Sequence, residues 1–209
     1  MIHEGDLMQD LSSIKMENGL LYETIITTKN SDGTPNAAPV GIVCKNGSKI
    51  ILYLSEAIHT LQNIKNNGHF IVNILKDPTI FTKSIVGELS PDCFKNHLND
   101  FYITNTDAFF SATVIKSKEI EKGHKIGNSK LTIITAKVNE IIIKNKNVEP
   151  LNRANFAIIE SLIYLCQINI VDNKTAQLYL ERINEMSRLV TRVGSKEHKK
   201  AMKKIISRL

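Results

Sequence analysis

Residues 22–42 read YETIITTKNSDGTPNAAPVGI, and this stretch decides the fold. Its first part, from Thr24 to Thr28, consists of threonine and isoleucine, residues that suit a pleated, half-buried strand. The turn residues NSDG follow at positions 30–33, where Gly33 can adopt a positive φ. The pattern predicts a β-hairpin, but the return limb NAAPVG at positions 36–41 consists of small side chains and a proline. Such a strand packs little side-chain volume.

The small residues of the return limb leave room for a flat ligand to lie against the backbone. Pro39 cannot donate a hydrogen bond to a neighbouring strand, so we expect this strand to be at an edge or locally irregular there. Ala37, Ala38 and Gly41 remove steric bulk, and the peptide groups near them can hydrogen-bond the edge of a ring. The alternative is a close-packed crossing of two strands, and the segment alone does not decide between them.

Strand patterns continue to Lys144, and a helical period replaces them after Pro150. Strands are expected at 49–55, 70–75, 109–115 and 131–143, and short strands separated by turn residues are typical of a barrel or a sandwich. Two helices are expected to interrupt them, at 57–66, where Asn67-Gly68 ends the pattern, and at 79–86.

Three helices are expected in the last quarter of the chain. Residues 155–170 carry a broad apolar face at helical spacing, made of Phe156, Ile159, Leu162, Ile163 and Cys166. A second helix is expected between the capping residues Asp172-Asn173 and Gly194, and a third after Ser195. The predicted fold class is therefore mainly β with a helical C-terminal part (α+β).

Composition restricts the class of protein. The chain has 209 residues, 42% apolar and 23% charged, as in an ordinary globular protein, and no apolar run approaches the ~20 residues that span a bilayer. The start MIHEGDLMQD lacks the apolar core of a signal peptide. Cys44, Cys93 and Cys166 are scattered and odd in number, so we expect reduced thiols in a cytoplasmic protein.

The positive charge of the chain is concentrated at its C-terminal end. Residues 188–209 carry eight Lys or Arg and one acid, a net charge of +7 against +6 for the whole chain. A basic amphipathic helix can bind nucleic acid or an anionic surface. However, Ala201, Ile205 and Leu209 share one helical face, which favours a docked helix with a solvated lysine side.

Several common catalytic patterns are missing from the sequence. The six histidines form no HxH, HxxxH or HExxH pattern, so we expect no dedicated metal site. There is no GxSxG nucleophile motif. The stretch GHKIGNSK at 123–130 does not have the spacing of a phosphate loop, and we interpret it as a β-hairpin turn.

The segment LSEAIHTL at 54–61 indicates an anion site. A strand ends at Ser55 and a helix begins within a few residues, and a helix start presents unpaired N–H groups. Ser55 and Thr60 add hydroxyl groups and His59 adds an imidazole, although Ser55 can equally be a simple helix cap. Asn73 interrupts the apolar strand FIVNIL, and a buried asparagine needs partners that a ligand can supply.

The order of these motifs carries a family resemblance. TT-x-N-x-DG-x-x-NAAPVG, then YLSEAIHTLQNIKNNG, then HFIVNIL resembles the FMN-binding split β-barrel proteins, which include flavin reductases and pyridoxamine-phosphate-oxidase-like proteins. More narrowly, YETIITT, NAAPVG and NRANFAIIESLIY resemble an uncharacterised archaeal family of such barrels. The broad resemblance covers residues 22–143 and the narrower one nearly the whole chain. It implies a split β-barrel at 1–147, and a helical extension at 148–209 that packs on the barrel or on a dimer partner.

The resemblance also implies a cofactor site. Ser55, His59 and Thr60 would lie at the FMN phosphate, although many relatives have Lys or Arg in place of His59, which leaves the charge partner of the phosphate open. The isoalloxazine ring would be lined by Asn36, Ala37, Ala38, Pro39, Val40 and Gly41, with Asn73 nearby. Tyr22, Glu23 and Thr24 would lie at the pocket edge.

The function implied by the resemblance is that of an FMN-dependent oxidoreductase, with FMN at a homodimer interface and an unidentified small-molecule reductant or substrate. Tyr22, Glu23 and His59 are candidate proton donors only through their closeness to the motif. Two alternatives stay open. One is a non-catalytic protein that binds a flavin or deazaflavin, and the less favoured one is nucleic-acid binding through the basic C-terminal helix.

Overall fold

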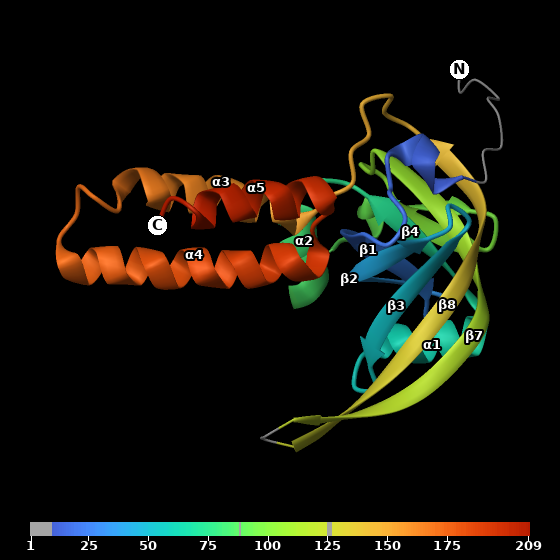
Figure 1. Cartoon of the computed structure of the whole chain (residues 1–209). Helices are drawn as coiled ribbons and strands as arrows, with labels where there is room; N and C mark the ends of the chain where they lie inside the picture. Colours follow the sequence, from blue (N-terminus) through green and yellow to red (C-terminus); the bar gives the residue numbers. More distant parts are fainter. Residues whose placement is uncertain (1–9, 88, 125–126) are drawn as a thin grey trace. The chain divides into compact units, whose positions relative to one another are not determined.

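The computed structural model describes residues 10–87, 89–124 and 127–209, and its centre is a closed β-barrel (Figure 1). The barrel strands are β1 (Leu21–Lys29), β2 (Pro35–Lys45), β3 (Lys49–Ser55), β4 (His69–Ile74), β7 (Ala108–His124) and β8 (Gly127–Ile143). They follow the order β1-β2-β3-β8-β7-β4, and β4 pairs back with β1 in antiparallel register. A separate two-stranded sheet consists of β5 (Phe94–His97) and β6 (Asp100–Ile103).

The helices are α1 (His59–Asn67), α2 (Pro78–Val86), α3 (Arg153–Gln167), α4 (Asn173–Val193) and α5 (Lys196–Ile206). This arrangement confirms the predicted fold class, a mainly β body with a helical C-terminal part. The chain divides into two compact units. The barrel unit comprises the residues up to Gly19 and Glu23–Leu151, and the helical unit comprises Leu20–Tyr22 and Asn152–Leu209, whereas the sequence led us to expect the division after residue 147.

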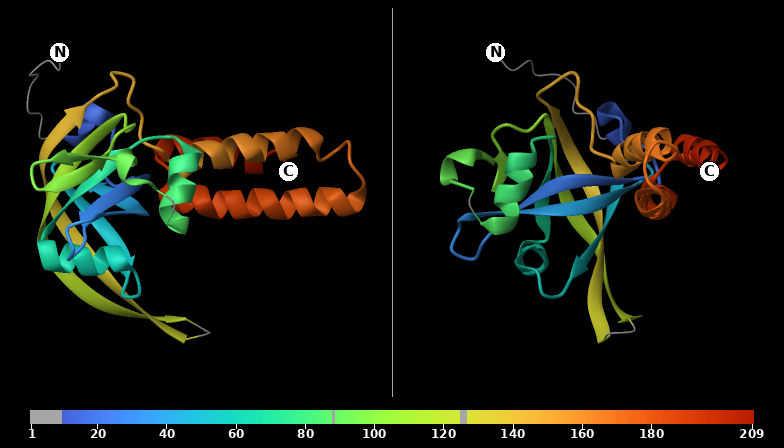
Figure 2. Two further views of the ribbon diagram at one scale, coloured as in Figure 1. Left: turned by 180° about the vertical axis from the view of Figure 1, so that it is seen from behind. Right: turned by 90° about the vertical axis from the view of Figure 1, so that its left-hand side faces the viewer.

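Two sequence interpretations involve residues that the structure does not describe. The signal-peptide argument rests largely on residues 1–9, and the expected turn at 123–130 has Lys125 and Ile126 at its centre. The described parts of β7 and β8 pair as far as His124 and Gly127, and together they form a long hairpin (Figures 1 and 2). Within the described ranges, none of the helices has the length and apolar character needed to traverse a lipid bilayer.

The strand pattern of the sequence builds the barrel core. Side chains alternate between the two faces of a strand, and Val40, Ile42 and Cys44 of β2 are buried, as are Ile50 and Leu52 of β3. Burial raises the pKa of the Cys44 thiol, which favours the neutral form and an inert core role.

The sequence predicts an edge or a local irregularity of β2 at Pro39, and Pro39 lies outside the segment of β2 that pairs with β3. β2 lies between β1 and β3 in the closed barrel. Its register with β3 runs from the pair Ile42–Leu52 to the pair Lys45–Lys49. Pro39 precedes this paired segment, so the missing N–H of the proline does not interrupt it.

The helical unit packs α3, α4 and α5 around their own core (Figure 1). On α3 the buried residues are small, namely Ala154, Ala157 and Ser161. α4 contributes the buried residues Ile183, Val190 and Val193, and α5 contributes Met202 and Ile205. The broad apolar face that the sequence indicates on α3 therefore does not form this core, because the close approach of the neighbouring helices selects the small side chains.

The C-terminal helix α5 is docked through its apolar side. Met202 and Ile205 are buried, while Leu209 follows the helix and is 50% exposed. The lysines of α5 lie on its exposed side, as the docked-helix interpretation expects. The helix starts with a capping box in which Ser195 and His198 satisfy each other's backbone N–H groups.

The junction between α4 and α5 depends on Gly194. A Cβ at this position would lie 2.6 Å from the Val190 carbonyl oxygen and 2.9 Å from the His198 Cβ. We therefore expect Gly194→Ala to lower the free energy of unfolding by about 1–3 kcal/mol, because helix backbone must move to relieve the overlap. Urea unfolding followed at 222 nm measures the change. Thr191→Ala, on the exposed side of α4, is the control, and an equal loss in both variants would contradict the steric explanation.

Candidate functional site

Three of the predicted cofactor residues meet in one polar network between β1, β2 and α1. The Asn36 Nδ2 amide donates to the Thr60 hydroxyl and to the Thr28 hydroxyl, both at 3.1 Å. His59 Nε2 lies 2.9 Å from Asn30 Oδ1. The return limb of the hairpin and the first turn of α1 are thus joined by side chains, as the motif order implies.

The network has three further members that the sequence patterns did not identify as site residues, namely Thr28, Asn30 and Asn63. Asn63 Nδ2 donates to the Thr28 hydroxyl at 3.0 Å and to Asn30 Oδ1 at 2.8 Å, and Asn63 is almost fully buried. A signal was present, because Asn63 follows Thr60 by three residues and residues at this spacing share a helix face. These bonds fix the direction in which the first turn of α1 points.

The start of α1 has no side-chain cap. The residue at the N-cap position is Ile58, which gives no side-chain hydrogen bond to the first turn. The interpretation of Ser55 as the helix cap is wrong, because Glu56 and Ala57 form a turn between the strand end and the helix. The Ser55 hydroxyl instead accepts a hydrogen bond from the Ala57 N–H at 3.4 Å. The Leu61 N–H donates to the Ile58 carbonyl at 3.1 Å, so the donors of the first turn that an anion can use are the His59 and Thr60 N–H groups.

Glu56, the acid that precedes this helix in the chain, is held by other groups. Glu56 accepts a hydrogen bond from the Thr132 hydroxyl, and its other oxygen lies 3.1 Å from Lys65 Nζ. The Thr132 bond and then Lys65 lower the pKa of Glu56. Lys65 also contacts Glu119 at 3.1 Å, and this bond is the main cause that raises the Lys65 pKa. Glu56 thus shares the positive charge of Lys65 with Glu119.

Asn73 does not have the role that the sequence led us to expect. Its side chain is 0% exposed, and its amide donates to the Ile25 carbonyl at 3.0 Å and to the Thr27 hydroxyl at 3.1 Å. Its Oδ1 accepts from the Ile103 N–H at 2.8 Å. Asn73 therefore needs no ligand, because the protein itself supplies its partners, and it ties β1 and β4 to β6.

Four more predicted residues are largely covered by the protein itself; Tyr22 belongs to the helical unit and the other three to the barrel unit. Tyr22, Thr24 and Val40 are buried, and the Thr24 hydroxyl donates to the Val40 carbonyl at 2.8 Å. Glu23 is half-buried, and its N–H donates to the Leu151 carbonyl at 2.8 Å. These residues position β1 against its neighbours.

The small residues of β2 are only partly covered. Ala37, Ala38, Pro39 and Gly41 are all half-buried. Strand alternation places Ala37, Pro39 and Gly41 on one face, and Ala38 on the other. Ala37 of β2 and Ile80 and Phe81 of α2 all pack against one cluster of buried residues, which consists of Ile25, Leu75 and Ile103. These residues are therefore not fully buried, as they would be in a close-packed strand crossing.

The described residues contain no cluster of three or more His, Cys, Asp or Glu side chains that could hold a metal ion. The candidate site brings together the start of α1, the Thr60 hydroxyl and the exposed His59 imidazole, and the Asn36 amide holds Thr60 to Thr28. Such donors bind an anionic oxygen group, and a phosphate has the matching acceptors.

Comparison with known proteins identifies relatives of the whole chain. A curated relative, an uncharacterised protein of Methanocaldococcus jannaschii, is 26% identical over 186 residues, which cover 86% of this chain and 93% of the relative. The crystal structure of an FMN-bound DUF447 protein from Methanosarcina mazei is 25% identical with a TM-score of 0.55, and the match covers 96% of this chain and 100% of that one. The styrene monooxygenase flavin reductase of Pseudomonas putida S12 is 12% identical with a TM-score of 0.48, over 68% and 89% of the two chains.

Two family descriptions match the chain in succession. "Protein of unknown function (DUF447) N-terminal domain" matches residues 22–145, and "Protein of unknown function (DUF447)" matches residues 152–207. These matches cover both the barrel and the helices, and they confirm the narrower family resemblance found in the sequence. The chain belongs to the DUF447 family.

Proposed function

We propose that this protein binds FMN, with the phosphate at the start of α1 and the ring along the return limb of the β1–β2 hairpin. The observation that carries the proposal is the network in which Asn36, His59 and Thr60 surround an uncapped helix start. The FMN-bound relative from Methanosarcina mazei supports the choice of ligand, since it matches the full length of the chain.

The donor set fits a phosphate group by its chemistry. Thr60, at the second helical position, is 2% exposed, and its hydroxyl accepts a hydrogen bond from Asn36 while keeping its own hydrogen to donate. The His59 and Thr60 N–H groups belong to the same helix start, where the helix dipole favours negative charge. The first turn of α1 contains no acid, and Glu56 pairs with Lys65, which it shares with Glu119. His59 replaces the cation expected from related barrels, and its exposed imidazole contributes a hydrogen-bonding group near Asn30.

The proposed ring contacts are a subset of the residues expected from the sequence. Ala37, Pro39 and Gly41 share a half-buried strand face, and Asn36 connects that strand to the phosphate end. Ser55 and His59 are exposed and can contact the ligand directly. The buried residues Thr24, Val40 and Asn73 of the barrel unit would instead shape the wall behind it, with Glu23 at its edge.

FMN, when bound, supplies hydride or single-electron transfer, and the protein's residues bind and orient it. We propose that the protein uses this chemistry as an oxidoreductase with a small-molecule reductant. We further propose that FMN lies at a homodimer interface. In support, α2 beside β2 has no buried residue and ends in Ile85 and Val86, which are 73% and 56% exposed, an apolar surface that a partner subunit can cover.

Titration with FMN and riboflavin tests the proposal. Bound FMN is expected to show bands near ~370 and ~450 nm, and FMN is expected to bind at least about tenfold more tightly than riboflavin, which lacks the phosphate. Equal affinity for the two would reject the phosphate site, and no binding of either would reject the cofactor. A deazaflavin carried through purification would show a different spectrum.

A second measurement separates binding from turnover. Under anaerobic conditions, NADH, NADPH or dithionite is added to the FMN complex, and the band near ~450 nm is followed. Bleaching by a nicotinamide nucleotide supports an oxidoreductase. Bleaching by dithionite alone, with no reduction by any supplied biological donor, would favour the non-catalytic alternative.

A further inference from the structure

The outward face of α3 carries an apolar seam with the spacing of a coiled coil. Phe156, Ile159, Ile163, Cys166 and Ile170 follow one another at intervals of three, four, three and four residues, the a and d positions of a heptad repeat. We call these five residues the α3 seam. Phe156 is 55% exposed, Ile159 54% and Ile163 44%, and Ile170 just beyond the helix is 81% exposed.

The rest of α3 indicates that this seam is built for contact. The fully buried residues of α3 are small, and Ile158, Tyr164 and Leu165 are partly buried against the core, whereas the apolar residues of the seam are left exposed. Over its 15 residues α3 contains only two charged side chains, Arg153 and Glu160. A solvated helix usually carries polar residues on its outer face, and a contiguous exposed apolar patch marks an interaction site.

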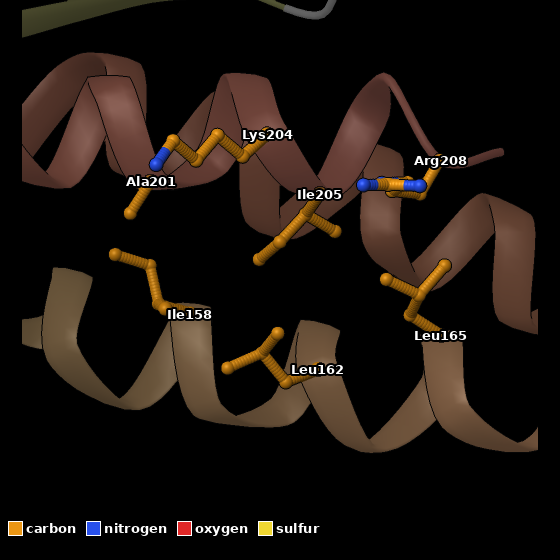
Figure 3. Close-up of a pocket in the computed structure, with 7 residues that line it drawn as sticks. All are labelled: Ile158, Leu162, Leu165, Ala201, Lys204, Ile205 and Arg208. Carbon is orange, nitrogen blue, oxygen red and sulfur yellow. The ribbon is translucent and has the colours of Figure 1, made fainter.

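The two edges of the seam differ in charge. On one edge a groove of about 350 Å³ separates α3 from α5 (Figure 3). Its α3 side consists of Ile158, Leu162 and Leu165, and its α5 side of Ala201, Lys204, Ile205 and Arg208. On a helical wheel Glu160, the one carboxylate of α3, lies on the other edge, at the e position of the heptad, whereas Leu162 is at the g position.

Glu160 of α3 and Lys204 of α5 also lie at similar heights along the helix axes. Figure 3 shows Ala201 over Ile158, Ile205 over Leu162 and Arg208 over Leu165. α3 and α5 therefore run in the same direction. Lys204 precedes Ile205 by one residue, so it lies near the level of position 161, one residue from the level of Glu160.

We propose that the α3 seam pairs with the α3 seam of a second copy of this chain, with the two helices parallel about a two-fold axis. In a parallel pair the e edge of each helix faces the g edge of its partner. Glu160 then approaches the partner's Lys204, and the contact forms twice. An antiparallel pair would set like edges together, bringing Lys204 and Arg208 of the two copies toward each other, which is unfavourable.

The proposal concerns the helical unit and does not depend on FMN binding. A parallel seam brings each residue next to its own copy, so Cys166, a free and exposed cysteine, lies beside the partner's Cys166. Mild oxidation of the native protein with copper–phenanthroline, at about 50 μM, is expected to yield a covalent dimer on a non-reducing gel. Cys166→Ser should abolish the dimer, and Cys93→Ser should leave it unchanged.

A second cysteine position tests the helix direction. In the Cys166→Ser background, Phe156→Cys places a thiol at the other end of the seam, and it should also form a covalent dimer. Cross-linking at both ends requires parallel helices, because antiparallel helices separate at least one of these pairs. Loss of cross-linking at either position in folded protein, checked by circular dichroism, would overturn the parallel seam. Loss of cross-linking is also the outcome expected if the seam instead binds a lipid or an unrelated protein.

Charge reversal tests the pairing of the edges. Glu160→Lys and Lys204→Glu should each slow formation of the Cys166 cross-link about fivefold or more, and the double variant should restore the native rate. Lys203→Glu is the control, because it makes the same charge change on an exposed neighbour that does not line the groove. If all three single variants behave alike, the effect is one of net charge and the proposed pairing is wrong.

Discussion

Replacing Asn73 by alanine is expected to lower the free energy of unfolding by about 3 kcal/mol, within a range of about 2–4 kcal/mol. The side chain is 0% exposed and bridges three backbone or hydroxyl groups. Alanine leaves the Ile103 N–H without its acceptor at 2.8 Å and removes a donor from the Ile25 carbonyl. Each buried group left unpaired costs about 1–3 kcal/mol, and the small cavity adds to the loss.

Chemical denaturation of Asn73→Ala measures this loss, and Asn139→Ala provides the control. Asn139 is also a strand asparagine, but it is exposed and makes a hydrogen bond to the Thr113 hydroxyl at 2.9 Å, so its removal should change stability by less than about 0.5 kcal/mol. FMN affinity should change little in any Asn73→Ala protein that remains folded. A stable variant that loses FMN affinity would show that Asn73 contacts the ligand after all.

For Asn73, the sequence predicts that the residue is buried but does not predict which groups it bonds. A polar residue within FIVNIL indicates a buried amide that needs partners, and that much is correct. The pattern does not say whether those partners come from a ligand or from the protein. The answer depends on β6, whose Ile103 N–H reaches Asn73 from 30 residues along the chain. Contacts of this kind follow from tertiary packing, which one sequence does not encode in any local signal.

Local sequence patterns predicted correctly those element ends that depend on neighbouring residues alone. Strand β3 begins and ends as predicted, and Gly68 ends α1 with φ 74°, in the left-handed region that favours glycine. The start of α1 was less predictable. Ser55 has the chemistry of a cap, but the course of the two following residues determines which residue occupies the N-cap, and that residue is Ile58.

The C-terminal helices show a different limit. The periodicity of α3 identifies an apolar face correctly, and by default such a face is assigned to the core. The structure buries Ala154, Ala157 and Ser161 instead. Hydrophobic spacing states that a face avoids water, and it does not state whether the cover belongs to the same chain. Only the packing of α4 and α5 reveals that the large side chains remain outside.

Removing the hydroxyl of Thr60 is expected to weaken FMN binding by about tenfold to a hundredfold, if the phosphate lies at the start of α1. Thr60→Val keeps the shape of the side chain and removes a donor at the second position of the helix. A hydrogen bond to a charged group contributes about 1.5–3 kcal/mol, which corresponds to this range of affinity. Asn36 keeps its bond to the Thr28 hydroxyl at 3.1 Å, so the network should survive the substitution.

Riboflavin gives this experiment its specificity, because it presents the same ring without the phosphate. Thr60→Val should leave riboflavin affinity unchanged and so reduce the preference for FMN over riboflavin. The matched control is Thr79→Val, which changes an exposed threonine at the second position of α2, and it should alter FMN affinity by less than about twofold. An equal weakening of FMN and riboflavin by Thr60→Val would place the hydroxyl at the ring or in the wall. The phosphate would then have to be held elsewhere, and the uncapped start of α1 would need another explanation.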